Sequence, residues 1–594
     1  MFQTFDVASD PSTGPARLNA LRAALTDLDV DGFLVPRADV HQGEYVAPCD
    51  ARLQWLTGFS GSAGFCAVLP KIAGVFVDGR YRVQVRSQVA DVFTPVDWPE
   101  VALADWLVAQ LPEGGKVGYD PWLHTVAEIE KLTRALANTG ILLCPIPNPI
   151  DQIWADQPPP PAAPYRAHPL EFSGETQDAK CTRLAETLKA DHAIITLPDS
   201  VAWLLNIRGS DIARNPVPHA LAILSRGGTA QLFARTGQAD PVMDHLGANV
   251  KVNDWSAFSD RVAGLAGSVQ IDPASCPMAV KELIAADQLK RATDPCSLPK
   301  ACKNATEIAG TRAAHQRDAI AMVHFLAWLD EEAPKGQLTE IDVVTQLEGF
   351  RRGANNLRDI SFDTIAGAGP HGAIVHYRVD NTTNRQVGTG ELLLVDSGGQ
   401  YDDGTTDITR TISIGPPTAE HRMCYTQVLR GMIAISMARF PKGVGGQHLD
   451  ALARIPLWQA GRDYDHGTGH GVGSYLCVHE GPQSLSRRST VALAPGMILS
   501  NEPGYYREGA FGIRIENLIV TITAPDLPSA DDREMYAFET LTYVPFDRRL
   551  IDVAQLTRAE QDWINQYHAD TLQRLAAHVD ASVKPWLTAA CAPL

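Results

Sequence analysis

Four carboxylate residues and one histidine in the C-terminal half of the chain have the side chains and surroundings of a metal site. Each lies where folding alone hardly explains a polar residue, at the end of an apolar strand-like run or in a glycine-rich turn: Asp396, Asp407, His470, Glu502 and Glu516. Carboxylates gathered in one place repel one another, so a shared site needs positive charge, and a divalent ion is the simplest source. One imidazole among carboxylates is typical of Mn²⁺, Fe²⁺, Co²⁺ or Zn²⁺ in an oxygen-rich pair site. The set therefore predicts a hydrolase that uses two metal ions.

The first two carboxylates are predicted to meet through a turn. Asp396 follows four consecutive apolar residues and precedes Ser-Gly-Gly, a context that also suits an ordinary turn. After the next turn, Asp407–Ile412 alternates with the period of a strand, and a return strand would bring Asp407 beside Asp396. Asp402 and Asp403 compete for the same role, but their place in the turn favours solvated capping. Two adjacent carboxylates make half of a metal site.

The histidine comes from a glycine-dense loop, His466–Gly473, which holds two histidines. Backbone freedom and little bulk let a histidine approach a buried centre. A nucleotide-binding interpretation is disfavoured, because no Lys-Ser/Thr pair follows and the GxGxxG spacing after a strand is absent. We therefore expect the glycines to make room around a metal.

The last two carboxylates follow apolar runs as well. Glu502 comes after Met497–Leu499, and Glu516 lies within the strand-like run Gly512–Val520. Arg514 and Glu516 share one face of that predicted strand. A structural ion pair between them is one interpretation. A metal on Glu516 with Arg514 as outer support is the other.

Composition limits the partners that we expect. The chain has 51 basic and 69 acidic residues, a formal net charge of −18, which disfavours nucleic acid or an anionic membrane. The N-terminus lacks the basic and apolar regions of a secretion signal, and no apolar stretch is long enough to span a bilayer. The 10 cysteines form no CxxC pair, as is typical of reduced thiols in a cytosolic protein. We expect a cytoplasmic protein without a nucleic-acid or membrane partner.

The chain is long enough for about three or four domains. Pro158–Pro164 can continue neither a helix nor a central strand and predicts a linker. Strand-like runs at Asp31–Pro36 and Ala73–Arg80 indicate an α/β unit before it, and a similar order of elements returns after it. Leu53–Gly61 and Val201–Gly209 both place tryptophan and leucine before a turn that ends in glycine, which favours a diverged internal repeat.

A third region opens near Lys303. Asn304 and Glu307 resemble a helix-capping pair, so a long amphipathic helix should begin here. The tail from Leu556 predicts a closing helix, for which we expect a role in packing or in a dimer contact.

With these motifs in hand, the chain resembles the Xaa-Pro aminopeptidases (aminopeptidase P) of the long, three-domain kind, within the creatinase and methionine aminopeptidase (peptidase M24) superfamily. The resemblance covers about Asp50 to Tyr567 and is densest in Val375–Arg378, Val395–Gly398, Asp403–Thr411, His466–His479, Asn501–Gly504 and Arg514–Asn517. It implies a multidomain α/β protein with two creatinase-like N-terminal α/β domains and a pita-bread α+β catalytic domain, a curved sheet backed by helices. The expected division is 1–157 for the first creatinase-like domain, 158–302 for the second, 303–525 for the catalytic domain and 526–594 for a C-terminal extension that supports packing or dimerisation.

The resemblance also implies roles for single residues. Two divalent ions per chain, manganese with zinc or cobalt as alternatives, would be held by Asp396, Asp407, His470, Glu502 and Glu516, with Asp407 and Glu516 bridging. The residues expected to act in catalysis are His376, His479 and Glu502. Those expected to bind substrate are His376, His466, His479 and Arg514.

The implied activity is that of a metal-dependent aminopeptidase. It would release the first residue of peptides with proline in second position, through a hydroxide shared by the two ions, and would work as a homodimer. One alternative is a prolidase, which cleaves only Xaa-Pro dipeptides and would use the same ligands. The other is a non-catalytic peptide-binding protein of the same fold. The long N-terminal architecture and the sequence Val478–Pro482 favour the aminopeptidase.

Overall fold

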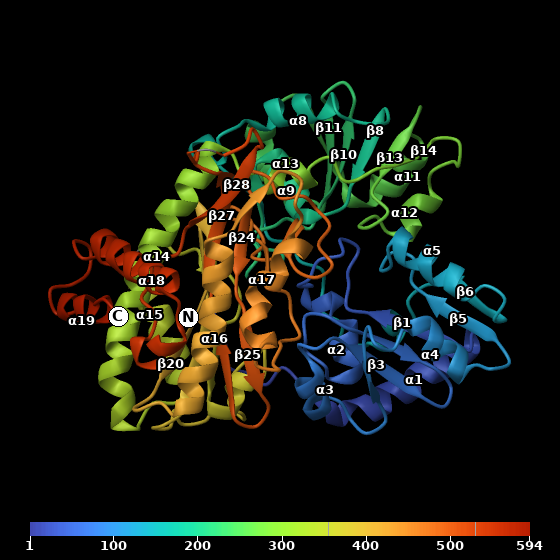
Figure 1. The fold of residues 1–594 in the computed structure, drawn as a ribbon. Coiled ribbons are helices and arrows are strands. Elements are labelled where there is room, and N and C mark those ends of the chain that lie inside the picture. Colours follow the sequence, from blue (N-terminus) through green and yellow to red (C-terminus); the bar gives the residue numbers. More distant parts are fainter. Residues whose placement is uncertain (354–355, 529) are drawn as a thin grey trace. The chain divides into compact units, whose positions relative to one another are not determined.

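The computed structural model describes the chain except for residues 354–355 and 529 (Figure 1). It divides into two compact units. The N-terminal unit is Ala8–Ser297, and the C-terminal unit is Met1–Val7 together with Leu298–Leu594. The first seven residues join the C-terminal unit because the Phe2 backbone N–H donates to Glu348 at 2.7 Å and the Asn381 N–H donates to the Phe5 carbonyl at 2.9 Å.

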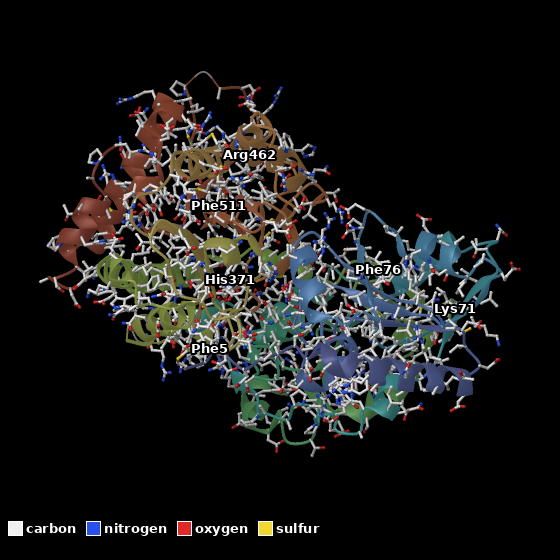
Figure 2. The ribbon with its side chains drawn as sticks, turned by 90° about the horizontal axis from the view of Figure 1, so that it is seen from below. Phe5, Lys71, Phe76, His371, Arg462 and Phe511 are labelled. Atoms are coloured by element: carbon white, nitrogen blue, oxygen red, sulfur yellow. The ribbon has the colours of Figure 1, made fainter. Side chains whose placement is uncertain are left out.

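The first half of the N-terminal unit is built on a six-stranded sheet in the order β4-β3-β2-β1-β5-β6. Its strands are β1 (Gly32–Pro36), β2 (Phe65–Val68), β3 (Ala73–Val77), β4 (Thr94–Asp97), β5 (Gly115–Tyr119) and β6 (Ile141–Pro145). Alternate residues of β1 point to opposite faces of this sheet. Phe33 and Val35 of β1 join the core under α1 (Gly14–Asp27), whereas Leu34 joins the core on the other face with Phe76 (Figure 2). The two strands predicted in this region are therefore confirmed, and the second ends at Val77.

The second half repeats the same topology. Its sheet has the order β12-β11-β10-β8-β13-β14, from β8 (His192–Ile195), β10 (Leu221–Ser225), β11 (Ala230–Ala234), β12 (Val250–Asp254), β13 (Val269–Ile271) and β14 (Leu289–Arg291). The central strands, β1 and β8, each pair antiparallel with one neighbour and parallel with the other. In both sheets the outermost strand at each edge pairs parallel with its neighbour. This equivalence supports the predicted internal repeat. The proline-rich segment 158–164 between the halves has no helix or strand, as its composition predicts.

Two pairs of helices line the C-terminal unit: α14 (Ala305–Glu332) packs on α15 (Glu340–Gly353), and α16 (Ala419–Ser436) on α17 (Gly446–Trp458) (Figure 1). Helix α14 begins as the sequence predicts. The Asn304 side chain accepts the Glu307 N–H at 3.0 Å, and the Glu307 carboxylate accepts the Asn304 N–H at 2.9 Å.

The sheets of this unit carry the candidate metal-binding residues. One sheet has the order β16-β17-β20, from β16 (Ile365–Ala368), β17 (Leu392–Ser397) and β20 (Ile408–Ser413). A six-stranded sheet has the order β21-β28-β27-β24-β22-β23, from β21 (Arg439–Pro441), β22 (Gly469–Gly471), β23 (Glu480–Leu485), β24 (Ile498–Asn501), β27 (Asn517–Thr523) and β28 (Met535–Thr540). A hairpin of β25 (Gly504–Arg507) and β26 (Phe511–Arg514) completes the region.

The strand predicted over residues 512–520 is interrupted. Strand β26 ends at Arg514 and pairs with β25, whereas β27 begins at Asn517 and pairs with β24 and β28. Between them the Glu516 backbone N–H donates to the Thr409 carbonyl at 3.1 Å. The prediction of one continuous strand is therefore wrong, because the chain changes partner strands at Ile515–Glu516.

The C-terminal extension packs onto the same unit. Helix α18 (Arg558–Leu575) confirms the predicted closing helix, and Ile564 and Tyr567 share a core cluster with Phe511, which Figure 2 marks inside this unit. Leu587 of α19 (Lys584–Ala590) joins the core beneath α14. Among the helices that the structure describes, none has the length and hydropathy to cross a membrane.

Candidate metal centre and its surroundings

The strand pairing brings distant carboxylates together. Strand β17 pairs antiparallel with β20, with Asp396 opposite Thr409, so Asp407, the residue just before β20, returns toward Asp396 as predicted. Glu516 reaches the same place from the junction of β26 and β27, where the Thr409 hydroxyl donates to its carboxylate at 2.8 Å. Asp396, Asp407 and Glu516 are only 8%, 4% and 1% exposed, although carboxylates are rarely buried without a partner.

His470 points one ring nitrogen at these carboxylates. Its Nδ1 lies 3.0 Å from the Gly471 carbonyl oxygen, which can only accept, so Nδ1 carries a hydrogen and Nε2 is the nitrogen that could bind a metal. That Nε2 lies 3.5 Å from Asp407 Oδ2 and 3.4 Å from Glu502 Oε1. A backbone carbonyl on the second nitrogen is the usual support of a metal-binding histidine.

Three oxygen atoms in this cluster have no hydrogen-bond partner within the described part of the chain: Asp396 Oδ1, Asp407 Oδ1 and Glu516 Oε1. Ligand atoms of Asp407, His470 and Glu516 all lie within 4.8 Å of one another. Buried carboxylate oxygens are costly unless something positive binds them. The residues present therefore fit divalent metal ions.

The electrostatics agree with this interpretation. Burial raises the pKa of Asp396 to about 6, and the charges of Asp407 and Glu502 add to the rise against the pull of Arg514. Burial and the neighbouring carboxylates also raise the pKa of Glu516. Burial alone would lower the pKa of His470, but Asp407 and Glu502 raise it to about 9. Without a metal the centre holds extra protons, which an ion must displace.

The glycines around His470 have a different role from the one we expected. A Cβ at Gly469 would lie 1.9 Å from the Ser500 carbonyl oxygen, and one at Gly471 would lie 2.2 Å from that of Glu480. These glycines let β22 approach the backbones of its neighbours β24 and β23. The prediction that they make room around a metal is wrong for these two positions.

Arg514 forms an ion pair with Asp396 and not with Glu516, the carboxylate that the sequence placed on the same strand face. Its Nη2 donates to Asp396 Oδ2 at 2.6 Å, its Nη1 to the Tyr506 hydroxyl at 2.6 Å and its Nε to Thr409 Oγ1 at 3.3 Å. The ion pair between Arg514 and Glu516 suggested by the sequence is thus replaced, because the strand break at 515–516 turns the two side chains to different partners. Arg514 is 1% exposed, so this network is buried.

Two further histidines flank the centre. The His479 ring lies edge-on to the His470 ring with centroids 4.2 Å apart. His466 donates from Nδ1 to the Gly467 carbonyl at 2.7 Å, and its Nε2 is 2.8 Å from the Tyr506 hydroxyl, which also accepts from Arg514. A continuous chain of contacts therefore joins His466 to Asp396.

His376 is placed by the loop that follows η6 (Gly369–Ala373) and is partly exposed. This segment packs closely on the β26 strand, because a Cβ at Gly512 would lie 1.6 Å from the Gly372 carbonyl oxygen. The buried Glu340 holds the loop by accepting from the Tyr377 hydroxyl at 2.8 Å.

Sequence reasoning missed two members of the site. Tyr506 links His466 to Arg514, but the run Tyr505–Tyr506 carries no signal that separates one tyrosine from the other. Thr409 bridges Glu516 and Arg514, and its place on the same strand face as Asp407 was the signal available for it.

Comparisons with known proteins agree with this fold and site. Residues 309–523 match metallopeptidase family M24, residues 17–153 and 156–307 match the creatinase/prolidase N-terminal domain, and residues 534–594 match the C-terminal region of peptidase M24. Aminopeptidase P1 of Arabidopsis thaliana is 37% identical over 97% of this chain and 99% of its own length. A probable Xaa-Pro aminopeptidase P of Coccidioides posadasii (strain C735) is 38% identical over 99% of this chain and 95% of its own length.

A solved structure extends the likeness to three dimensions. The X-prolyl aminopeptidase from Caenorhabditis elegans, described as a cytosolic enzyme with a dinuclear active site, matches with a TM-score of 0.94 and 33% identity over 98% of this chain and 100% of its own. The fold and the centre thus define a metallopeptidase of the M24 class with creatinase-like N-terminal domains. Within that class, the chain belongs to the Xaa-Pro aminopeptidase (aminopeptidase P) family. The family and the fold class predicted from the sequence are confirmed.

Proposed function

We propose that this chain is a metal-dependent aminopeptidase that releases the first residue from peptides whose second residue is proline. The observation that carries the proposal is the meeting of Asp407, His470 and Glu516, with unpartnered carboxylate oxygens around them, in a member of this family. A non-catalytic relative that had lost its ligands would not keep this buried cluster.

We assign the metal positions to Asp396, Asp407, His470, Glu502 and Glu516, with Asp407 and Glu516 as bridging ligands. The oxygen-rich donor set suits manganese, with zinc or cobalt as alternatives. When bound, two such ions lower the pKa of a shared water and polarise the scissile carbonyl. The buried carboxylates would supply the negative charge that holds both ions.

Glu502 is our candidate for moving protons. Its Oε1 accepts a hydrogen bond from the Ser500 hydroxyl at 3.0 Å, which fixes the carboxylate beside His470. Burial raises its pKa, so this group can hold a proton taken from water and give it to the departing proline nitrogen.

His376 and His479 are proposed to contact the peptide on either side of the scissile bond. An imidazole N–H there would stabilise the developing oxyanion or bind the peptide next to proline. His466 is proposed to face the substrate while Tyr506 holds its ring. The prediction that Arg514 binds substrate stays a prediction. Its three bonded nitrogens support a role in orienting Asp396 and Tyr506.

We also propose that the enzyme acts as a cytoplasmic homodimer, with domains bounded at 1–157, 158–302, 303–525 and 526–594. The formal charge of −18 argues against nucleic acid or an anionic membrane as a partner.

Variants of the two bridging carboxylates test the metal centre. Asp407→Asn or Glu516→Gln removes a charge on which both ions depend, so hydrolysis of Xaa-Pro-Yaa peptides should fall by at least about two orders of magnitude. Elemental analysis should show fewer bound ions than in the unmodified protein. Asp402→Asn is the matched control, because Asp402 binds Arg358 at the surface and should be dispensable. Full activity in the Glu516→Gln protein would contradict the proposal.

A further inference from the structure

A second cluster of metal-capable side chains lies in the N-terminal unit, outside the centre described above. Ligand atoms of Asp39, Asp50 and His219 all lie within 4.8 Å of one another. Asp39 is in the loop after β1, Asp50 ends the short helix η2 (Pro48–Asp50), and His219 is in the loop before β10. The cluster therefore connects the loops of the first sheet to those of the second. Asp39 and His219 are 1% and 2% exposed.

Protein donors hold at least one oxygen of each carboxylate. Asp39 Oδ1 accepts the backbone N–H of His41 at 2.9 Å and that of Gly43 at 3.3 Å. Asp50 Oδ1 accepts from Arg52 Nη1 at 2.9 Å, and its Oδ2 accepts from the Cys49 thiol, whose sulfur is 3.3 Å away. Asp39 Oδ2 has no hydrogen-bond partner, although His219 Nε2 is 3.3 Å away. Asp39 therefore has one oxygen fixed and the other without a partner in the cluster, which is typical of carboxylate ligands that the protein orients.

His41 adds a second observation that points to a ligand. Its ring packs beside that of His219, with centroids 4.6 Å apart. Its Nδ1 lies 3.0 Å from the Thr196 carbonyl oxygen, so Nδ1 carries the hydrogen and Nε2 presents a lone pair. That Nε2 is buried and unpartnered, in a side chain of a residue that is 1% exposed. A backbone carbonyl fixing the other ring nitrogen is the arrangement found around metal-binding histidines.

The local charges leave room for a cation. Arg52 divides its positive charge between Asp50 and Asp151, because its Nε also binds Asp151 at 2.7 Å. Within the part of the chain that the structure describes, Asp39 forms no ion pair with a lysine or arginine, although Arg37 and His41 interact with its charge and His219 Nε2 lies 3.3 Å from its Oδ2. A protonated His219 would satisfy Asp39 but would leave the His41 lone pair without a donor. A divalent ion offsets the charges of both carboxylates and accepts both imidazole lone pairs.

We propose that Asp39, Asp50 and His219, with the neighbouring His41 as a fourth ligand from outside that 4.8 Å group, bind one divalent transition-metal ion that ties the loop after β1 to the loop before β10. Two carboxylate oxygens and two imidazole nitrogens suit a closed tetrahedral zinc site, which contributes stability rather than chemistry. The site is independent of the centre in the C-terminal unit.

Metal counting on the full chain tests the proposal, with Zn²⁺ as the probe. The Asp407→Asn, Glu516→Gln double variant serves as the background, because it weakens the other centre. Adding Asp39→Asn should lower the zinc content by one ion per chain. The amide keeps the Oδ1 acceptor and can donate to His219 Nε2, so the loop should stay folded. Asp120→Asn is the matched control, since this buried carboxylate accepts from Trp122 and Asn148, lies outside the cluster and should leave the count unchanged.

A second variant guards against a folding defect in the first. His219→Gln should also lose one zinc ion, whereas His192→Gln, which alters a histidine bonded to Ser225 and the Ala266 carbonyl, should lose none. Chelation should lower the thermal midpoint of the background protein but not that of the protein with Asp39→Asn added. Equal zinc contents with and without Asp39→Asn would overturn the proposal and leave a metal-free ion pair of Asp39 and His219. Because every comparison is made within one background, the result does not depend on the other centre.

Discussion

Asp396 shows how the metal centre divides the work of a single carboxylate. Arg514 fixes its Oδ2 at 2.6 Å, while Oδ1 is buried without a hydrogen-bond partner. One oxygen is thus used by the fold and the other remains for an ion. At Glu516, Oε2 accepts from the Thr409 hydroxyl and Oε1 is unpartnered.

Protons and metal compete for this centre, which predicts a pH dependence of metal uptake. The pKa of Asp396 is raised to about 6 by burial, and that of His470 to about 9 by Asp407 and Glu502 despite burial. At neutral pH the ion-free centre therefore carries protons that the ion must release. The affinity for Mn²⁺ should rise as the pH increases from about 6 toward about 8, with fewer protons released per ion. Titration calorimetry in buffers of different ionisation enthalpy measures both quantities. A dissociation constant that does not change with pH would contradict this account.

Substitutions of His470 and His479 should have different effects on metal binding and activity. His470→Ala removes the nitrogen that faces Asp407 and Glu502, so metal and activity should be lost together. His479→Ala should keep the ions and the fold but lower kcat/KM, as expected when contacts to the transition state are lost. His324→Ala is a control, because this side chain bonds within α14 and to the Asp580 N–H. Loss of the ions in the His479→Ala protein would show that its assignment beside the substrate is wrong.

For single residues, the sequence predicted which residue types form the metal centre but not which side chains contact one another. The candidate ligands stand out because each ends an apolar run or lies in a glycine-rich turn. The bond between Arg514 and Asp396 joins residues 118 positions apart, and no local pattern predicts it. Period-two alternation suggested Glu516 as the partner of Arg514 instead, because it assumed an unbroken strand.

The elements around the centre were predicted where local signals agree. The turn and the alternation after Asp403 correctly predicted the antiparallel pairing of β17 with β20, and the capping pair correctly predicted the start of α14. The break between β26 and β27 could not be predicted in this way, since alternation continues through Ile515. It depends on the contact with Thr409, which belongs to another strand.

A buried ion cluster sets the start of β23, directly after His479. Glu480 binds Lys300 Nζ at 2.9 Å and also binds Lys303, and the three side chains are 0%, 3% and 1% exposed. Glu480→Gln would remove the buried carboxylate charge that both ammonium groups contact, so stability should fall by about 3–5 kcal/mol. Denaturant unfolding measures the loss. His479, which we place beside the substrate, directly precedes Glu480. Kinetics should therefore show a lower kcat/KM, because His479 is no longer held in position when the ion pairs of Glu480 are lost.

The control for this prediction is another lysine and glutamate pair. Glu534 binds Lys442 at 2.8 Å with both side chains largely exposed, so Glu534→Gln should leave stability and activity unchanged. Equal unfolding midpoints for Glu480→Gln and the unmodified protein would contradict the anchoring role.

The whole molecule combines a repeated α/β topology with a separate metal-binding unit. Both N-terminal sheets have the same strand order and the same senses of pairing, which the shared tryptophan, leucine and glycine pattern only hinted at. That pattern marks one helix and turn in each half, whereas the sheet order depends on long-range pairing that a single sequence does not reveal. The closing helix α18 was predictable, but its core contacts with α16 and the β26 strand were not.

The most direct measurement of the central claim is a comparison of peptide substrates. Manganese-loaded protein is incubated with Xaa-Pro-Yaa, Xaa-Pro and Xaa-Ala-Yaa peptides, and the products are identified by mass spectrometry. The account predicts release of the first residue from Xaa-Pro-Yaa, little cleavage of Xaa-Ala-Yaa, and loss of the activity on chelation. Faster turnover of Xaa-Pro dipeptides than of any longer peptide would contradict it and indicate a prolidase.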